Sequence, residues 1–460
     1  MRNLIVLAPV AWGIGAGLWT PRGPLTANEA LWSVALSAAV GVAAGRVSRS
    51  RWAMLFAPAA FVVALELTRI PVGGPSVDVP QLSTFGLIAL VTGRGLHGIL
   101  AVLPMIVGAA YGAALTRDRR AGRRIPRYLR RAGVATLAAA VGLVAFGVAV
   151  PARTPPIAGG VAELVTVDAG GYDLRLLVRG RDAAKPVLLF VPGAPGAMEM
   201  GATRRHLGAL EDHFVVATLD RRGYPALDSG PPISLDTGVA DTITVTNFLR
   251  TRFGQDRIYL LAHSGGSLLG ALAAARHPEL YKAYVGTGQA VDLPETDGIF
   301  YADILSWARA TRNDELERRL VDLGPPPYQD FYSYEPIVAN TAAVYAQGDP
   351  ASVDDIMVEE YPLLDQLHTV NALLDTWHAQ YPDMQRVDLR RDVPRLAVPA
   401  YFVQGADETR GISEPFAQWY AQLAAPAKRL FVLDAAGHRA MFEQPAGFVD
   451  AMLAILAGTT

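Results

Sequence analysis

A serine lies where an apolar strand pattern runs directly into a helix pattern. Residues 261–267 read LAHSGGS, with Ser264 at the centre. A sharp strand-to-helix turn of this kind lifts a serine hydroxyl above a sheet edge, and it is tight enough to require small residues two before and two after the serine. Ala262 and Gly266 meet that requirement. The segment therefore predicts Ser264 as a nucleophile.

A serine hydroxyl needs a base to accept its proton before it attacks a carbonyl. His438 follows the last predicted strand, residues 429–433, and precedes the last predicted helix. We therefore predict His438 as the base. His263 is adjacent to the serine, but it lies inside the turn, where its side chain is expected to point away into packing.

The base needs an acid that orients it, and this acid is expected after the preceding strand, residues 400–404. Asp407 lies there and gives the order Ser, Asp, His, which is known for hydrolases with this turn. An alternative role for Asp407 is to cap the following helix. The reserve candidates for the acid are Glu408, Asp434 and Asp292.

Acyl transfer also needs two backbone N–H groups aimed at the developing negative charge, which together form an oxyanion hole. We expect one from Gly265, the residue after the serine. The other is expected from Ala194, in the Gly- and Pro-rich loop 192–196 that follows an early strand. The alternative for this loop is an ordinary Pro-Gly turn.

Short apolar runs alternate with helical patterns from residue 161 onward. Strands are expected at 161–167, 174–178, 186–191, 214–219, 258–262, 281–285, 400–404 and 429–433. This rhythm is typical of an α/β fold with a mostly parallel, doubly wound sheet. We assign residues 161–289 and 396–460 to that core, and 290–395 to a helical cap over the carboxyl ends of its strands.

These motifs resemble the α/β-hydrolase superfamily, and within it the proline iminopeptidase-like group, over about residues 160–450. PGAPG at 192–196 is similar to the group's HGGPG, and DRRGY at 220–224 is similar to its DQRGxG. The serine turn, GTGQ at 286–289, and the positions of Asp407 and His438 also match. The resemblance implies Ser264 as nucleophile, Asp407 as acid and His438 as base.

The chain departs from the group at several positions. Pro192 and Ala194 replace a His and a Gly of the oxyanion loop, and Ala262 replaces a Gly of the serine turn. Gly265 stands where the aminopeptidases usually carry Trp. These differences weaken the implied prolyl specificity and leave the hydrolase chemistry intact.

The resemblance does not extend to the first third of the chain, which has a different character. Residues 1–155 contain 16 Arg, no Lys and four acidic residues, whereas residues 156–460 carry a net charge of −14. The Arg residues punctuate apolar runs, so nucleic-acid binding is not expected. Five stretches have about the length needed to cross a bilayer: 4–19, 30–46, 52–68, 99–115 and 132–150. We assign 1–150 to a transmembrane bundle and 151–160 to a linker.

Basic loops indicate the orientation, because short loops rich in Arg stay in the cytoplasm. The basic loops near 46–51 and 116–131 both lie in the cytoplasm if the N-terminus is inside and the chain has five spans. Residues from 151 onward are then expected outside the cytoplasm. The apolar stretch 85–98 is interpreted as re-entrant or interfacial. As a sixth span, it would instead put the enzyme in the cytoplasm. Glu66 is expected at the interface near Arg69.

The sequence thus predicts a membrane-anchored serine hydrolase without metal or organic cofactor, acting on a small molecule or short peptide. A proline iminopeptidase-like aminopeptidase is favoured. A carboxylesterase or lipase, and a non-catalytic scaffold on a hydrolase fold, are the alternatives. Transport by the bundle has little support, because no paired charges are expected within its spans. The chain has no cysteine, which excludes disulfides and thiol catalysis.

Overall fold

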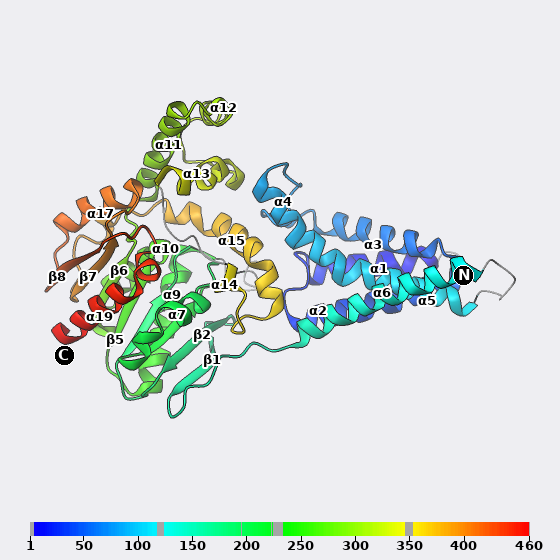
Figure 1. The fold of residues 1–460 in the computed structure, drawn as a ribbon, viewed down its shortest axis with the longest axis horizontal. Coiled ribbons are helices and arrows are strands. Elements are labelled where there is room, and N and C mark those ends of the chain that lie inside the picture. Colours follow the sequence, from blue (N-terminus) through cyan, green and yellow to red (C-terminus); the bar gives the residue numbers. More distant parts are fainter. Residues whose placement is uncertain are drawn as a thin grey trace. The chain divides into compact units, whose positions relative to one another are not determined.

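The computed structural model describes residues 4–116, 124–194, 196–221, 223, 233–345 and 353–459. The chain divides into two compact units. Unit 1 comprises Met1–Pro151 and Pro362–Asn371, and unit 2 comprises Ala152–Tyr361 and Ala372–Thr460. The first unit is helical, and the second contains an eight-stranded sheet flanked by helices (Figure 1).

All eight predicted strands are present in unit 2. They are β1 (Val161–Asp168), β2 (Asp173–Gly180), β3 (Val187–Val191), β4 (Val215–Asp220), β5 (Ile258–His263), β6 (Tyr281–Thr287), β7 (Ala400–Gly405) and β8 (Lys428–Leu433). The sheet has the order β1-β2-β4-β3-β5-β6-β7-β8. β1 pairs antiparallel with β2, and β2 pairs antiparallel with β4, whereas all other neighbours are parallel. The predicted mostly parallel sheet is therefore confirmed.

Helices cover both faces of the sheet. They are α7 (Met200–His206), α9 (Leu235–Phe253), α10 (Ser264–Arg276), α17 (Arg410–Gln422), α18 (Ala440–Glu443) and α19 (Pro445–Thr459), with short 3-10 helices η3 (Gly208–Asp212) and η4 (Pro278–Leu280). In β3, Leu189 packs with α9 and α10 on one face, while Leu188 and Phe190 pack with α7 and α19 on the other. The central strands are apolar on both sides for this reason.

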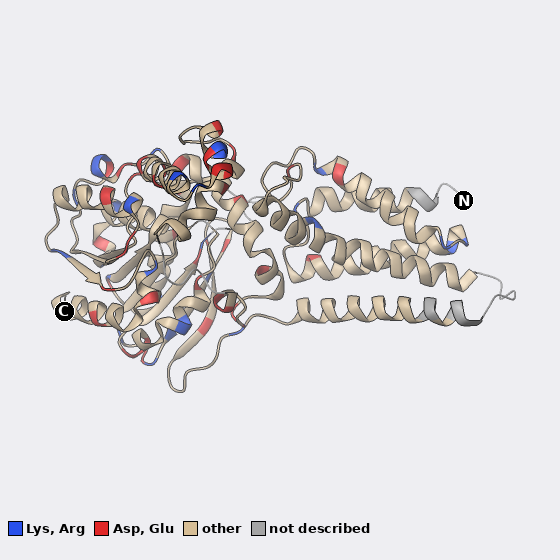
Figure 2. Ribbon diagram, turned by 45° about the horizontal axis from the view of Figure 1, so that its top comes forward, with Lys and Arg blue, Asp and Glu red and all other residues tan. Residues whose placement is uncertain are grey.

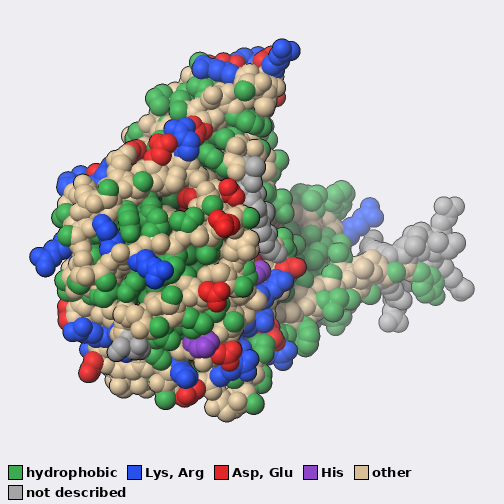
Figure 3. Space-filling view, turned by 60° about the vertical axis from the view of Figure 1, so that its left-hand side comes forward, with side chains coloured by type: hydrophobic (Ala, Val, Ile, Leu, Met, Phe, Trp, Pro, Cys, Tyr) green, Lys and Arg blue, Asp and Glu red, His purple; other side chains and the backbone are tan. Residues whose placement is uncertain are grey.

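The segment between β6 and β7, predicted as a cap, is helical. It contains α11 (Leu293–Ala310), α12 (Asp314–Leu323), η5 (Phe331–Tyr334), α13 (Glu335–Tyr345), α14 (Val353–Ile356), α15 (Leu363–Met384) and α16 (Leu389–Asp392). Residues 362–371 belong to unit 1, because Leu364 packs in one cluster with Ala30, Leu96 and Val148. Figure 3 shows acidic and basic side chains interspersed on the visible face of unit 2, without a large patch of one sign.

Unit 1 contains helices at all five stretches that the sequence marks as apolar. They are α1 (Leu4–Trp19), α2 (Ala27–Ser48), α3 (Ala53–Arg69), the run from α4 (Thr84–Leu90) through the π-helical segments η1 (Val91–Gly95) and η2 (Gly98–Val102) to α5 (Leu103–Thr116), and α6 (Arg124–Ala149). Charged residues are sparse along them (Figure 2). Within the described residues, three segments are long and apolar enough to cross a membrane: Ala27–Ser48, Thr84–Thr116 and Ala132–Ala149.

The structure does not separate residues 85–98 from the following apolar stretch, as the interpretation of a re-entrant or interfacial segment assumed. These residues continue without a break into the helix at 103–116, so Thr84–Thr116 is one helical run of 33 residues. Ser83 caps its start by accepting a hydrogen bond from the backbone of Gly86 at 3.1 Å. The basic loop that supports the expected orientation lies largely outside the described residues, which omit 117–123.

Glycines on two helices of unit 1 allow very close packing. A Cβ atom on Gly41 or Gly45 of α2 would lie 2.2 Å from a backbone carbonyl oxygen of α5. Reciprocally, a Cβ on Gly108 or Gly112 of α5 would lie 2.2 or 2.1 Å from a carbonyl oxygen of α2. Both pairs have the four-residue spacing at which small residues let membrane helices approach each other. The glycine content of this third of the chain therefore has a packing role.

Candidate active site

Ser264 lies at the turn between β5 and α10, as predicted. Its φ of 49° falls in the left-handed region, which is strained for a residue with a side chain. The turn leaves no room for larger neighbours, since a Cβ on Gly266 would lie 2.0 Å from the carbonyl oxygen of Pro192. Ala262, two residues before the serine, is fully buried. The turn therefore holds the hydroxyl at the carboxyl end of the sheet, at a helix N-terminus.

His438 reaches this hydroxyl from the loop after β8. Its Nε2 lies 2.8 Å from the Oγ of Ser264, a hydrogen-bonding distance, although the two residues are 174 positions apart. Gly288, after β6, makes space for the imidazole. Its φ is +50°, and a Cβ there would lie 2.9 Å from the Cε1 of His438. The structure thus brings together the predicted nucleophile and the predicted base.

The acid beside His438 is Glu408, not the predicted Asp407. Both carboxylate oxygens of Glu408 lie 3.0 Å from Nδ1 of His438, and its side chain is only 3% exposed. The Asp407 side chain is exposed, and the backbone N–H of Asp407 donates to the carbonyl oxygen of Ala436 at 2.8 Å. That bond fixes the turn after β7 so that residue 408, one position later, faces the imidazole. The prediction of Asp407 as the orienting acid is therefore corrected to Glu408, one of the reserve candidates.

The buried pair of Glu408 and His438 favours charge on both groups. Burial alone would lower the pKa of His438, but the charge and hydrogen bond of Glu408 outweigh it and raise that pKa above its ordinary value of 6.5. Burial likewise would raise the pKa of Glu408, yet His438 and the donors of Thr409 lower it overall. The acid thus stays ionised and stabilises a protonated imidazole.

The loop that carries Ala194 runs beside Ser264, and Gly265 follows the serine directly. Gly265 lies in the first turn of α10, where a backbone N–H has no acceptor within the helix. Ala194 follows Gly193, whose Cβ position lies 3.2 Å from the Cβ of Ser264 and whose carbonyl oxygen lies 3.3 Å from the Cβ position of Gly265. The loop after β3 therefore runs directly beside the nucleophile, which is the place that an oxyanion hole requires.

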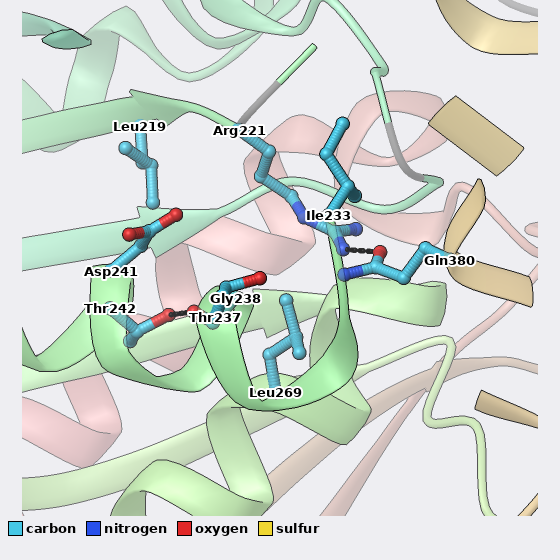
Figure 4. Close-up of a pocket in the computed structure, with 9 residues that line it drawn as sticks. All are labelled: Leu219, Arg221, Ile233, Thr237, Gly238, Asp241, Thr242, Leu269 and Gln380. Carbon is cyan, nitrogen blue, oxygen red and sulfur yellow. Dashed lines mark hydrogen bonds between the residues drawn. The ribbon is translucent and has the colours of Figure 1, made fainter. Parts of the chain in front are cut away.

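Arg221, after β4, holds the loop after β3 in place through hydrogen bonds. Its guanidinium donates to the carbonyl oxygen of Gly193 and to the side chain of Gln380 on α15. Figure 4 shows Arg221 beside a cavity of about 10 Å³ that Asp241 and Leu269 also line. Burial lowers the pKa of Arg221 to about 10, although Asp241 and Glu199 raise it. The buried cation therefore ties the oxyanion loop to a cap helix.

His263 is buried below the serine and does not face it, in agreement with the sequence argument. Its Nε2 lies 3.1 Å from the carbonyl oxygen of His438, and its Nδ1 lies 3.7 Å from a carboxylate oxygen of Glu199. Glu199 also accepts the N–H of Gly193 at 3.2 Å. Glu199 thus links the loop after β3 to His263, which in turn contacts the backbone of His438, a role of Glu199 that the sequence did not suggest.

A second buried network braces the first turn of α10. Gln289 donates to the Ser267 hydroxyl at 2.9 Å, and the N–H of Ala290 donates to the same oxygen at 2.9 Å. The hydroxyl of Tyr284 donates to Gln289 at 2.6 Å. The sequence singled out Gln289 only as part of the 286–289 motif. A polar residue directly after a buried strand is the sequence feature that could have indicated this supporting role of Gln289.

The comparison with protein families decides the assignment. Residues 186–445, more than half of the chain, match the model of the alpha/beta hydrolase fold family. The chain belongs to the α/β-hydrolase family. The match covers β3 to β8 and includes Ser264, Glu408 and His438. The chain is accordingly a hydrolase.

Relatives of this α/β-hydrolase include a probable aminopeptidase, YbaC, of Bacillus subtilis (strain 168). The two are 26% identical over 303 residues, which is 64% of this chain and 95% of the relative. The solved structure of a proline iminopeptidase-related protein from Thermus thermophilus is 19% identical, with a TM-score of 0.45, over 65% of this chain and 98% of that protein. A membrane phospholipase A structure is 22% identical, with a TM-score of 0.45, over 73% of this chain and 96% of its own.

Proposed function

We propose that this α/β-hydrolase is a serine hydrolase that works by acyl transfer through Ser264, His438 and Glu408. One observation carries the proposal. A continuous hydrogen-bonded chain runs from the Ser264 hydroxyl through the imidazole, at 2.8 Å, to a buried carboxylate at 3.0 Å. A nucleophile, a base and an orienting acid in this geometry are what activation of a serine requires.

In the first step, His438 takes the Ser264 proton while the serine oxygen attacks the substrate carbonyl carbon. The N–H groups of Gly265 and Ala194 donate to the oxyanion, and the Glu408 carboxylate stabilises the protonated imidazole. His438 then returns the proton to the leaving group, which departs and leaves an ester on Ser264. Water repeats the sequence, with His438 again as base, and releases the acid product.

The substrate class that we favour is a short peptide with a free amino terminus, because the relative from Bacillus subtilis is a probable aminopeptidase. A buried acid on the cap supports this choice. Asp297 of α11 is 6% exposed, and it accepts the Tyr381 hydroxyl at 2.6 and 2.7 Å. Burial raises the pKa of Asp297 to about 7, so a cationic group beside it would relieve an unfavourable environment.

Asp297 is connected to the serine through one cap helix. Its partner Tyr381 lies one helical turn before Met384 on α15, so both face the same side. The Met384 Cε lies 3.1 Å from the Cβ position of Gly265. These contacts link the buried Asp297 carboxylate to the residue that follows Ser264.

Purified full-length protein should be assayed on prolyl- and alanyl-arylamides, on their N-acetylated forms, and on p-nitrophenyl esters. The proposal predicts activity on the free-amine arylamides, and loss of that activity on acetylation. Asp297→Asn should raise KM for the free amines and leave ester hydrolysis unchanged. Asp303→Asn is the matched control, because that carboxylate lies on the same helix but pairs with Arg410. Hydrolysis of esters alone would reject the peptidase and favour a carboxylesterase or lipase.

The apolar helices of unit 1 lead us to propose that the chain is anchored in a membrane. The basic loops of the sequence lead us to propose that the hydrolase lies outside the cytoplasm. The chain is free of cysteine, so single cysteines report topology without further changes. We expect Asp182→Cys in unit 2 to react with an impermeant maleimide in intact cells. Ser50→Cys, in the turn between α2 and α3, should react only after lysis. The reverse pattern would place the hydrolase in the cytoplasm.

A further inference from the structure

Unit 1 contains a cavity of about 140 Å³ between α3 and the helical run Thr84–Thr116. Glu66 and Arg69 of α3 line it, together with Arg94 and His97 of the second element. The guanidinium Nε of Arg69 donates to Glu66 at 2.9 Å, and the Nε of Arg94 lies 3.5 Å from the same carboxylate. Glu66 and Arg69 thus form a pair near the end of α3, where the sequence places them close together, and Arg94 lies beside this pair.

The charges around the cavity do not balance. Arg69 and Arg94 are two cations, whereas Glu66 is the one carboxylate among the lining residues. The side chain of Arg69 is 4% exposed and that of Arg94 is 18% exposed, so both lie largely out of water. Arg94 also donates to the carbonyl oxygen of Val77 at 2.6 Å, which satisfies a donor but does not neutralise its charge. A charge in such surroundings is unfavourable without a counter-charge. The cavity wall therefore carries an excess positive charge that an anion would neutralise.

His97 gives an independent reason to expect a ligand. It is 3% exposed, and neither of its ring nitrogens has a hydrogen-bond partner among the described residues. Its ring packs edge-on against Phe61, which also lines the cavity. A neutral imidazole always carries one N–H donor, and a buried donor without an acceptor is costly. An oxygen atom of a bound anion would satisfy it.

The remaining wall of the cavity is apolar, which indicates that the anionic group of the ligand is attached to an apolar chain. Phe61, Val62, Leu65, Gly98 and Val102 complete the lining. Val62 is 37% exposed and the Glu66 side chain 40%, so the cavity reaches the surface of the helices. A cavity of this volume takes a group about the size of benzene. It can therefore hold a small head group with its first carbon atoms, while a longer chain leaves over Val62.

We infer that this cavity binds the oxyanion head of a single amphiphile, with the His97 ring donating to an oxygen, the two arginines supplying the counter-charge, and the alkyl chain along Phe61 and Leu65. The head is a carboxylate, as in a fatty acid, or a phosphate, as in a phospholipid. The inference does not rest on the proposed hydrolase mechanism, since none of these residues belongs to the catalytic site. Ser264→Ala should therefore bind the same amphiphile.

Binding can be measured on detergent-solubilised full-length protein by native mass spectrometry and by the shift in its melting temperature. The probes are palmitate, phosphatidylglycerol, methyl palmitate and inorganic phosphate. We expect palmitate or phosphatidylglycerol to bind, and the better of the two identifies the head group. His97→Phe, which keeps an aromatic ring but removes both nitrogens, should weaken that binding at least tenfold. Arg94→Gln should do the same.

Arg46→Gln is the matched control, because Arg46 is exposed on α2 and does not line the cavity. It should leave the Kd within twofold. If His97→Phe is misfolded by its melting profile, Val62→Phe fills the cavity from its exposed side and should abolish binding. Equal binding of methyl palmitate or of inorganic phosphate, no binding of any probe, or unchanged affinity in the cavity variants would overturn the inference.

Discussion

Replacing Glu408 by glutamine tests whether Glu408 or the neighbouring Asp407 orients the base, His438. The amide keeps the size of the side chain but removes the negative charge that lies 3.0 Å from Nδ1 of His438. It also offers an N–H where the imidazole N–H needs an acceptor, which favours the wrong tautomer. Asp407→Asn is a matched control, since it makes the same chemical change one residue away on an exposed side chain.

The size of the effect follows from what the carboxylate does during the reaction. The corresponding change in a serine protease lowers kcat about 10,000-fold with the geometry intact. At about 1.36 kcal/mol for each factor of ten, this is roughly 5.4 kcal/mol of lost transition-state stabilisation. The side chain of Glu408 is 3% exposed, so water cannot replace the lost charge. We therefore expect kcat of Glu408→Gln to fall about 1,000- to 10,000-fold, and kcat of Asp407→Asn to stay within about twofold, the scale of a neutral surface change.

The assay is steady-state hydrolysis of the best arylamide or ester by the two purified variants, with melting temperatures recorded to verify folding. A large loss in Asp407→Asn with little change in Glu408→Gln would refute the assignment of Glu408. A moderate, equal loss in both would show that neither carboxylate orients the base.

Three further outcomes follow from the site. The base must be neutral to accept the proton and the pKa of His438 is raised, so kcat/KM should fall with acid through a pKa above 6.5. In Glu408→Gln, which loses the largest cause that raises this pKa, a pH profile should show the same fall at lower pH. Gly288→Ala should lower kcat about 100-fold in the same assay, because its Cβ would displace the His438 ring, and misplacements near 1 Å have that effect. Arg221→Met removes a charge-assisted hydrogen bond to Gly193 worth roughly 1.5–3 kcal/mol, so kcat/KM should fall about tenfold to a hundredfold; an unchanged value would show that this bond does not support the oxyanion loop.

The sequence predicts the sheet well, because its strands are short apolar runs and its helices have clear boundaries. Gly254, for example, ends α9 with a φ of 62°, as expected of a helix C-cap. The small residues around Ser264 and the His438 position after the last strand are likewise local patterns. These features depend on residues close together in the chain, which is why they can be recognised without a structure.

The choice between Asp407 and Glu408 could not be made in this way. Both follow β7, and the bond from the Asp407 N–H to the carbonyl oxygen of Ala436 decides which side chain turns inward. Ala436 belongs to the distant loop before His438, so no local pattern encodes this contact. The supporting roles of Glu199 and of Arg221, which belongs to the 220–224 motif, were missed for the same reason, since their partners lie on other loops and on the cap.

The organisation of unit 1 could likewise be predicted from the sequence only in part. The apolar segments and the glycine spacing on α2 and α5 are visible in the sequence. The continuity of residues 84–116 is not, because Arg94 and His97 interrupt the apolar pattern and suggest a break. Both side chains face the cavity together with Glu66 and Arg69, and the helix continues past them.

The central claim is that Ser264 is a nucleophile activated by His438, and covalent labelling tests it most directly. A fluorophosphonate probe forms a stable bond only with an activated serine. We expect stoichiometric labelling of the full-length protein at Ser264, no labelling of Ser264→Ala, and strongly slowed labelling of His438→Ala. Folded wild-type protein that remains unlabelled, or labelling that persists in Ser264→Ala, would contradict it.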